Sequence, residues 1–85
     1  MNPKNNTEYS VTAVGVIIPV EWDQKGNPQA YAISTYDEQE YLIDNTNDAG
    51  RKLTRMTHQK IRVSGNLGDM INNRRIMTVT GFERI

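Results

Sequence analysis

Three segments of the chain repeat one pattern, in which apolar and polar residues alternate and a glycine follows. They are residues 11–17, 61–67 and 77–82, and their glycines are Gly15, Gly65 and Gly81. Alternation with a period of two predicts strands that bury one face, and a glycine inside a strand indicates a bend or a bulge. Strands that bend at glycine can coil into a closed barrel. The pattern therefore predicts an architecture and says little about chemistry.

The first strand is expected to begin at Ser10 and to run to Trp22, with apolar residues on both of its faces. Val14, Val16, Ile18 and Val20 share one parity, and Val11, Ala13 and Ile17 share the other. We interpret this as a switch of the buried face at a bulge near Gly15. Pro19 restricts this part of the strand to a sheet edge, or to another position that needs no ladder hydrogen bond.

Turn and capping signals predict the remaining elements. Polar turns at residues 23–28 and 37–39 separate a second strand at 29–35 and a third at 41–43, and the first three strands form a meander. The cluster 44–48 is rich in helix-capping residues, and Ala49, Leu53 and Met56 follow on one helical face. A short helix is therefore expected over about residues 48–57. Strands at 60–67 and 74–85, joined by a loop at 68–73, complete the chain.

The length and composition bound the protein class. The 85 residues suffice for one domain, which we expect at residues 10–85 behind a disordered arm at 1–9. The chain has no cysteine, so neither a disulfide nor a thiolate metal site is expected. The polar N-terminus does not resemble a signal peptide, and the longest apolar run, residues 16–20, is too short to cross a bilayer. These features predict a cytoplasmic protein that is not associated with a membrane.

The order of the expected elements resembles the oligonucleotide/oligosaccharide-binding fold, or OB-fold, a small five-stranded barrel. The resemblance covers residues 10–85, and residues 61–67 are similar to the fourth strand of many such barrels. It implies an all-β protein with one short helix, in the order β-β-β-α-β-β. The chain also resembles small bacterial OB-fold proteins of unknown function, without the leader peptide of their periplasmic group. An SH3-like barrel is the alternative, although it does not usually have a full helix at that point.

The OB-fold resemblance implies where a ligand would lie, which is across strands two and three and against the loops that join strands one to two and four to five. There, aromatic rings could stack on bases and arginines could contact phosphates. The candidate nucleic-acid-binding residues in these regions and in the fourth strand are Lys25, Tyr36, Arg62, Asn72, Asn73, Arg74 and Arg75. Tyr31 and Tyr41 share parity with Ile33 and Ile43, which favours the core for both tyrosines.

The formal net charge of zero conceals two oppositely charged halves. Residues 1–50 hold two basic and eight acidic residues, whereas residues 51–85 hold eight basic and two acidic ones. Either the basic half binds a polyanion, or the two halves neutralise each other within the fold. Carboxylates around the third strand would repel a phosphate backbone and could instead pair with Arg74, Arg75 or Arg84. A basic surface on the helix and fourth strand is either a second nucleic-acid candidate or a solvated face; its residues are Arg51, Lys52, Arg55, Lys60 and Arg62.

Motifs for catalysis or cofactor binding do not stand out. His58 is the single histidine, so a transition-metal site would depend mostly on carboxylates, and a position near the helix C-terminus explains His58 better. We therefore expect no catalytic residue, metal ligand or cofactor, and predict a non-enzymatic binding module. The first hypothesis for its partner is single-stranded nucleic acid. The alternative is a protein-interaction or structural module with a protein partner, and an accessory domain of a larger protein also stays open.

Overall fold

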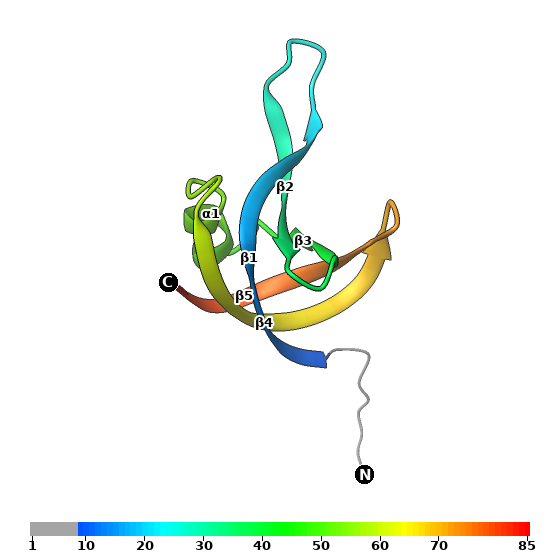
Figure 1. The fold of residues 1–85 in the computed structure, drawn as a ribbon. Helices are drawn as coiled ribbons and strands as arrows, with labels where there is room; N and C mark the ends of the chain where they lie inside the picture. Colours follow the sequence, from blue (N-terminus) through cyan, green and yellow to red (C-terminus); the bar gives the residue numbers. More distant parts are fainter. Residues whose placement is uncertain (1–8) are drawn as a thin grey trace.

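The structure is a computed structural model that describes residues 9–85. The arm expected at residues 1–9 therefore lies outside the described residues, except for Tyr9, with which the first strand begins. The elements are β1 (Tyr9–Trp22), β2 (Pro28–Thr35), β3 (Glu40–Ile43), α1 (Asp48–Leu53), β4 (Lys60–Ile71) and β5 (Arg74–Arg84). The predicted fold class and element order are confirmed (Figure 1).

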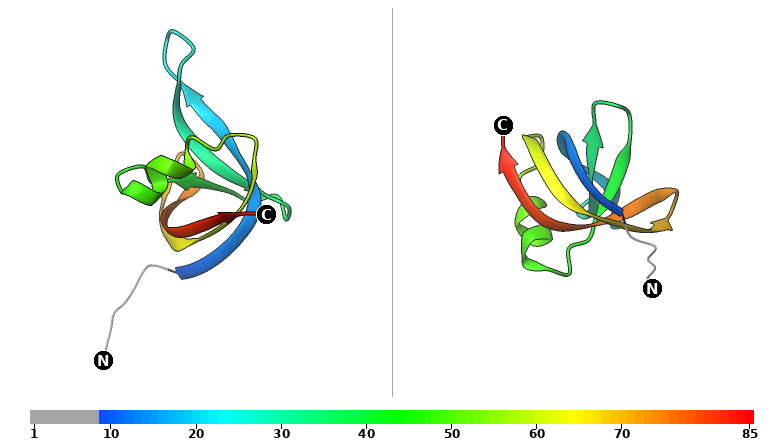
Figure 2. Two further views of the ribbon diagram at one scale, coloured as in Figure 1. Left: turned by 90° about the vertical axis from the view of Figure 1, so that its left-hand side faces the viewer. Right: turned by 90° about the horizontal axis from the view of Figure 1, so that it is seen from below.

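The five strands close into a barrel in the order β1-β2-β3-β5-β4. β1 pairs antiparallel with β4 over residues 9–16 and with β2 over residues 15–22, while β3 and β5 are parallel. Because Gly15 and Val16 have partners on both sides, this part of β1 joins the two pairings. Figure 2 shows the strong curvature of β4 and β5 that this closure requires.

Two of the three repeated glycines are required by close approach of neighbouring strands. A Cβ atom at Gly15 would collide with the Ser34 carbonyl oxygen of β2, and one at Gly65 would lie 2.5 Å from the Thr78 carbonyl oxygen of β5. Gly81 lies opposite Ser64, beside a register shift between β4 and β5. A Cβ atom at Gly81 would have no atom within 4 Å, so the packing there does not demand glycine.

The predicted bulge near Gly15 is wrong. β1 keeps an unbroken register with β4 through residues 9–16 and with β2 through residues 15–19, and the shifts fall later, between Pro19 and Trp22. Both faces of β1 are apolar because one faces the core and the other belongs to an apolar layer outside the barrel. Pro19 lies where β1 has separated from β4, as the edge-strand interpretation predicted.

Alternate residues of all five strands fill the barrel. The buried core consists of Ala13, Ile17, Ile33, Ile43, Leu53, Ile61, Val63, Leu67, Met77 and Val79. Tyr31 and Tyr41 pack against this core, which confirms the interpretation that favoured the core for both. Leu53 of α1 is fully buried, so the helix contributes directly to the barrel interior.

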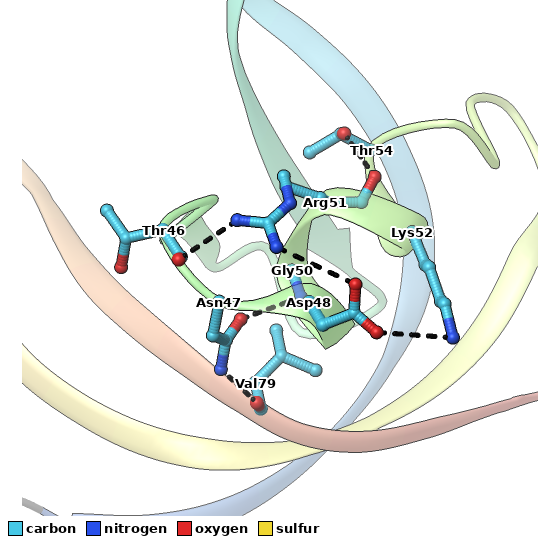
Figure 3. Close-up of polar contacts among 8 residues, drawn as sticks. All are labelled: Thr46, Asn47, Asp48, Gly50, Arg51, Lys52, Thr54 and Val79. Carbon is cyan, nitrogen blue, oxygen red and sulfur yellow. Dashed lines mark hydrogen bonds and ion pairs between the residues drawn. The ribbon is translucent and has the colours of Figure 1, made fainter.

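The helix begins as predicted but is shorter. Asn47 is the N-cap, and its side chain accepts a hydrogen bond from the Gly50 amide at 2.8 Å (Figure 3). α1 ends at Leu53, and Thr54 caps its C-terminus, so the expected extent to residue 57 is wrong. His58 accordingly lies beyond the helix, where it adopts a φ of 65° and donates its backbone amide to the Ile17 carbonyl. This bond attaches the segment between α1 and β4 to β1.

The fourth and fifth strands form a longer hairpin than expected. β4 continues to Ile71, and only Asn72 and Asn73 connect it to β5, so the predicted loop at 68–73 is mostly strand. Both asparagines have positive φ, 52° and 68°. Such angles suit a two-residue hairpin turn, and asparagine tolerates them better than most residues do.

Candidate binding surface

A groove lies between the β2–β3 turn and the β4–β5 hairpin. Its volume is about 800 Å³, and it is lined by residues 38–41, Leu67, Met70 and residues 72–75. Four of the seven predicted nucleic-acid-binding residues, Asn72 to Arg75, thus come together on one wall. The opposite wall carries Glu38 and Glu40, so the groove presents both signs of charge.

The arginines of the groove are engaged within the protein. Nε of Arg74 donates to Oε1 of Glu40 at 2.9 Å, and Nη1 of Arg75 donates to the Gly68 carbonyl oxygen at 2.9 Å. The expected pairing of third-strand carboxylates with β5 arginines is therefore confirmed for Glu40 and Arg74. A phosphate group would have to compete with these bonds and approach two glutamates.

Hydrogen bonds connect and shape the two protruding hairpins. Nδ2 of Asn72 donates to Oε2 of Glu21 at 3.1 Å, which links the β4–β5 hairpin to the β1–β2 hairpin. In the β1–β2 turn, Oδ1 of Asp23 accepts the backbone amides of Asn27 and Lys25, and these bonds lower the pKa of Asp23. The Lys25 side chain is exposed in this turn and does not line the groove.

The other two predicted residues also lie outside this groove. Tyr36 is exposed at the end of β2, and Nζ of Lys60 lies 5.4 Å from the centre of its ring, a cation–π contact. Arg62 forms an ion pair with Glu83 on the neighbouring β5. Tyr36 lines a second groove of about 340 Å³ against residues 11–14 of β1. The seven predicted nucleic-acid-binding residues therefore do not form a single surface.

The basic residues of α1 are also paired locally. Asp48 accepts contacts from Arg51 at 3.6 Å and from Lys52 at 3.3 Å, both within the helix (Figure 3). All three side chains are more than half exposed. This arrangement favours the solvated-face interpretation of the helix over a nucleic-acid surface.

Sequence reasoning missed a row of aliphatic side chains on the outside of the barrel. Strand register places four residues side by side across β1, β2, β3 and β5, namely Ile18, Ala32, Leu42 and Ile76. The residue before Ile18 and the residues after the other three belong to the core, so these four side chains point outward; the core residues are Ile17, Ile33, Ile43 and Met77. We call these four residues the outer row. The two apolar parities of the first strand were the sequence signal for it.

Ala32 shows that the outer row forms a layer of its own. Its exposure is 0%, although it does not belong to the core cluster inside the barrel. The side chains that bury it therefore lie on the outer face. Ile18, Leu42 and Ile76 are themselves only half-buried, so this layer is incomplete in the isolated chain.

A small hollow lies at the side of the outer row, next to Asp44. Its volume is about 230 Å³, and its lining includes Ala30, Leu42, Ile76, Asp44 and Thr46. Oδ1 of Asp44 accepts the Thr46 hydroxyl at 2.7 Å and the Thr46 amide at 2.9 Å, and Oδ2 accepts the Thr78 hydroxyl at 3.5 Å. The bonds from Thr46 lower the pKa of Asp44, so an ionised carboxylate is held in a fixed orientation at the hollow.

Neither clusters of metal-ligating residues nor similarity to known proteins indicates a further site in residues 9–85. Within residues 9–85, no group of three or more histidine, cysteine, aspartate or glutamate side chains could hold a metal ion. In the same part of the chain, no helix has the length and apolar character needed to span a membrane. No protein family, curated protein or solved structure matches the chain.

Proposed function

We propose that the chain is a binding module for a protein partner, and that the outer row is its contact surface. The observation that carries this proposal is the alignment of four aliphatic residues outside a barrel whose core is filled by other side chains. Contiguous apolar patches that stay accessible on a protein surface are typical of interaction sites. Burying them against a partner would complete the layer that already covers Ala32.

Exposed apolar side chains also lie on the two hairpins beside the barrel. Trp22 at the end of β1 is 54% exposed, and Met70 and Ile71 near the tip of the β4–β5 hairpin are 58% and 42% exposed. Both hairpins project from the barrel (Figure 1). Aromatic residues and methionine are enriched in protein interfaces, which supports the same partner class.

The strand order supports an OB-like barrel, whose ligands lie across strands two and three. The outer row crosses both of these strands. Its members are aliphatic, whereas binding of single-stranded nucleic acid usually depends on aromatic rings that stack with bases. Tyr31 and Tyr41, the aromatic residues of β2 and β3, pack against the core instead.

Single-stranded nucleic acid stays the second hypothesis because Asn72 to Arg75 line one wall of the large groove. Such a ligand gains most of its affinity by releasing counterions from its phosphates. The ion pair between Arg74 and Glu40 and the nearby Glu38 weaken that contribution. The protein-partner hypothesis is therefore favoured.

A selection from random peptides displayed on phage tests the proposal. Enriched peptides would be synthesised and titrated into the full chain carrying labelled methyl groups, with mixed-sequence oligonucleotides at low salt as a parallel arm. We expect the peptides to shift the methyl resonances of Ile18, Leu42 and Ile76. Leu42→Gln should weaken peptide binding by about tenfold, or about 1.4 kcal/mol, a loss that only the more important residues of an interface cause.

Ile85→Gln is the matched control, because Ile85 is also an exposed aliphatic residue but lies at the C-terminus. This variant should bind the peptides as the unmodified chain does. The proposal fails if no peptide moves the outer-row resonances, or if both substitutions have the same effect. Oligonucleotide binding with steep salt dependence and shifts at residues 72–75 would establish the nucleic-acid hypothesis in its place.

A further inference from the structure

We infer that the hollow beside Asp44 receives a lysine or arginine side chain of the protein partner. This inference rests on the proposed function, because the hollow shares Leu42 and Ile76 with the outer row. It adds the chemical character of the partner, which is a basic residue within an apolar segment.

The lining of the hollow fits the two parts of such a side chain. Ala30, Leu42 and Ile76 offer an aliphatic surface, and the Asp44 carboxylate lies beside it. Lysine and arginine have aliphatic stems that pack on apolar surface while their charged ends stay near water or an anion. A partner side chain could therefore place its stem on the aliphatic residues and its cation at Asp44.

Asp44 differs from the nearby Glu40 in its partners. Glu40, Leu42 and Asp44 alternate along the same face, since Tyr41 and Ile43 face the core. Glu40 is paired with Arg74, whereas the bonds described for Asp44 come from the hydroxyl and amide of Thr46 and the hydroxyl of Thr78. Within residues 9–85, no cation forms an ion pair with Asp44. Its charge is thus available to a partner.

The same charges disfavour a second copy of the chain as the occupant. Two copies that met through their outer rows would bring the Asp44 carboxylate of one chain, which no cation of residues 9–85 neutralises, toward the Asp44 carboxylate of the other. Like charges across an interface suppress association, whereas a basic partner complements them. The charge pattern therefore points to a different protein with a basic residue beside apolar ones.

Blocked amino acids provide a direct probe of the hollow. Nα-acetyl-lysine amide, its uncharged analogue Nα-acetyl-norleucine amide and Nα-acetyl-glutamate amide would each be titrated into the methyl-labelled full chain. We expect the lysine derivative to shift the methyl resonances of Ala30, Leu42 and Ile76, and to bind about two- to fivefold more tightly than the other two, as an ion pair near the surface allows. Asp44→Asn should remove this preference, while the control Asp48→Asn should preserve it.

Each outcome separates the inference from the proposed function. Equal binding of the lysine and norleucine derivatives, preference for glutamate, or no shift at the hollow would overturn the inference. If peptides from the selection still bound the outer row in that case, the proposed function would stand. If those peptides also failed to bind, both the inference and the proposed function would be wrong. The Asp44→Asn variant keeps a side-chain oxygen that can accept the Thr46 bonds, and an unchanged spectrum elsewhere would confirm that it is folded.

Discussion

Asn47 holds α1 against β5 by hydrogen bonds from both ends of its side-chain amide. Its Oδ1 accepts the Gly50 amide at 2.8 Å and caps the helix, while its Nδ2 donates to the Val79 carbonyl oxygen at 2.9 Å (Figure 3). A helix of six residues has little stability of its own. These two bonds, together with burial of Leu53, therefore fix the helix at the barrel.

Two substitutions of Asn47 should destabilise the fold to different degrees. Asn47→Ala removes the cap and the bond to Val79, and we expect a loss of about 1–3 kcal/mol in the free energy of unfolding. Asn47→Asp keeps the capping oxygen but loses the donor, so it should lie between the alanine variant and the unmodified chain. Urea denaturation measures the free energy of unfolding of both variants. The exposed Asn45, substituted by alanine, is the control, and equal losses at residues 45 and 47 would contradict the prediction.

Substitution of two strand glycines by alanine should change stability by very different amounts. At Gly15 the new methyl group would collide with the Ser34 carbonyl oxygen, and separating β1 from β2 should cost about 3 kcal/mol or abolish folding. At Gly81 nothing lies within 4 Å, and alanine should change stability by less than about 1 kcal/mol, because it also restricts the unfolded chain. Thermal unfolding of the two variants checks this. Similar melting temperatures would show that close strand approach at Gly15 is not limiting.

The ion pair between Arg74 and Glu40 should contribute modestly to stability. Their side chains are 27% and 40% exposed, so solvent screens the pair, and a double-mutant cycle with alanine should give a coupling of about 0.2–1 kcal/mol. The coupling should shrink as salt rises. The more exposed pair between Arg62 and Glu83 serves as the comparison and should couple less. A coupling that does not respond to salt would mean that packing, and not charge, joins the two residues.

Asp44 should make the fold sensitive to acid. Hydrogen bonds from Thr46 hold its pKa below the ordinary value of 3.8 in the folded state. The ionised form therefore stabilises the fold above that value, and this contribution disappears as the pH falls through the lower folded-state pKa. Asp44→Asn lacks this titration, so the difference in urea midpoint between the two chains should narrow as the pH falls below 3.8. A difference that stays constant would exclude this role of Asp44.

Local patterns were sufficient to predict most elements. Period-two alternation located five strands, the cluster at residues 44–48 located the helix start, and parity assigned Tyr31 and Tyr41 to the core. The errors occurred where contacts between residues far apart in the sequence determine the structure. α1 ends at Leu53, and its connection to β4 is fixed by the bond between the amide of His58 and the carbonyl of Ile17, which no local pattern encodes.

The candidate site was predicted only in part. Asn72 to Arg75 are consecutive, so the sequence could place them on one hairpin, whereas Lys25, Tyr36 and Arg62 came from elements whose relative positions were unknown. The outer row draws one residue from each of four strands. Finding it requires the register of every pair, because a shift of one residue moves a side chain to the other face.

The amino-acid sequence alone determined that this chain forms curved strands and one short helix, because alternation, capping and glycine positions act through near neighbours. The tertiary structure decided which charges neutralise one another and which apolar residues stay outside the core. Those outcomes depend on the pairing of strands that are distant in the sequence, which places Ile18 and Ile76 in one row across the sheet and Glu40 beside Arg74.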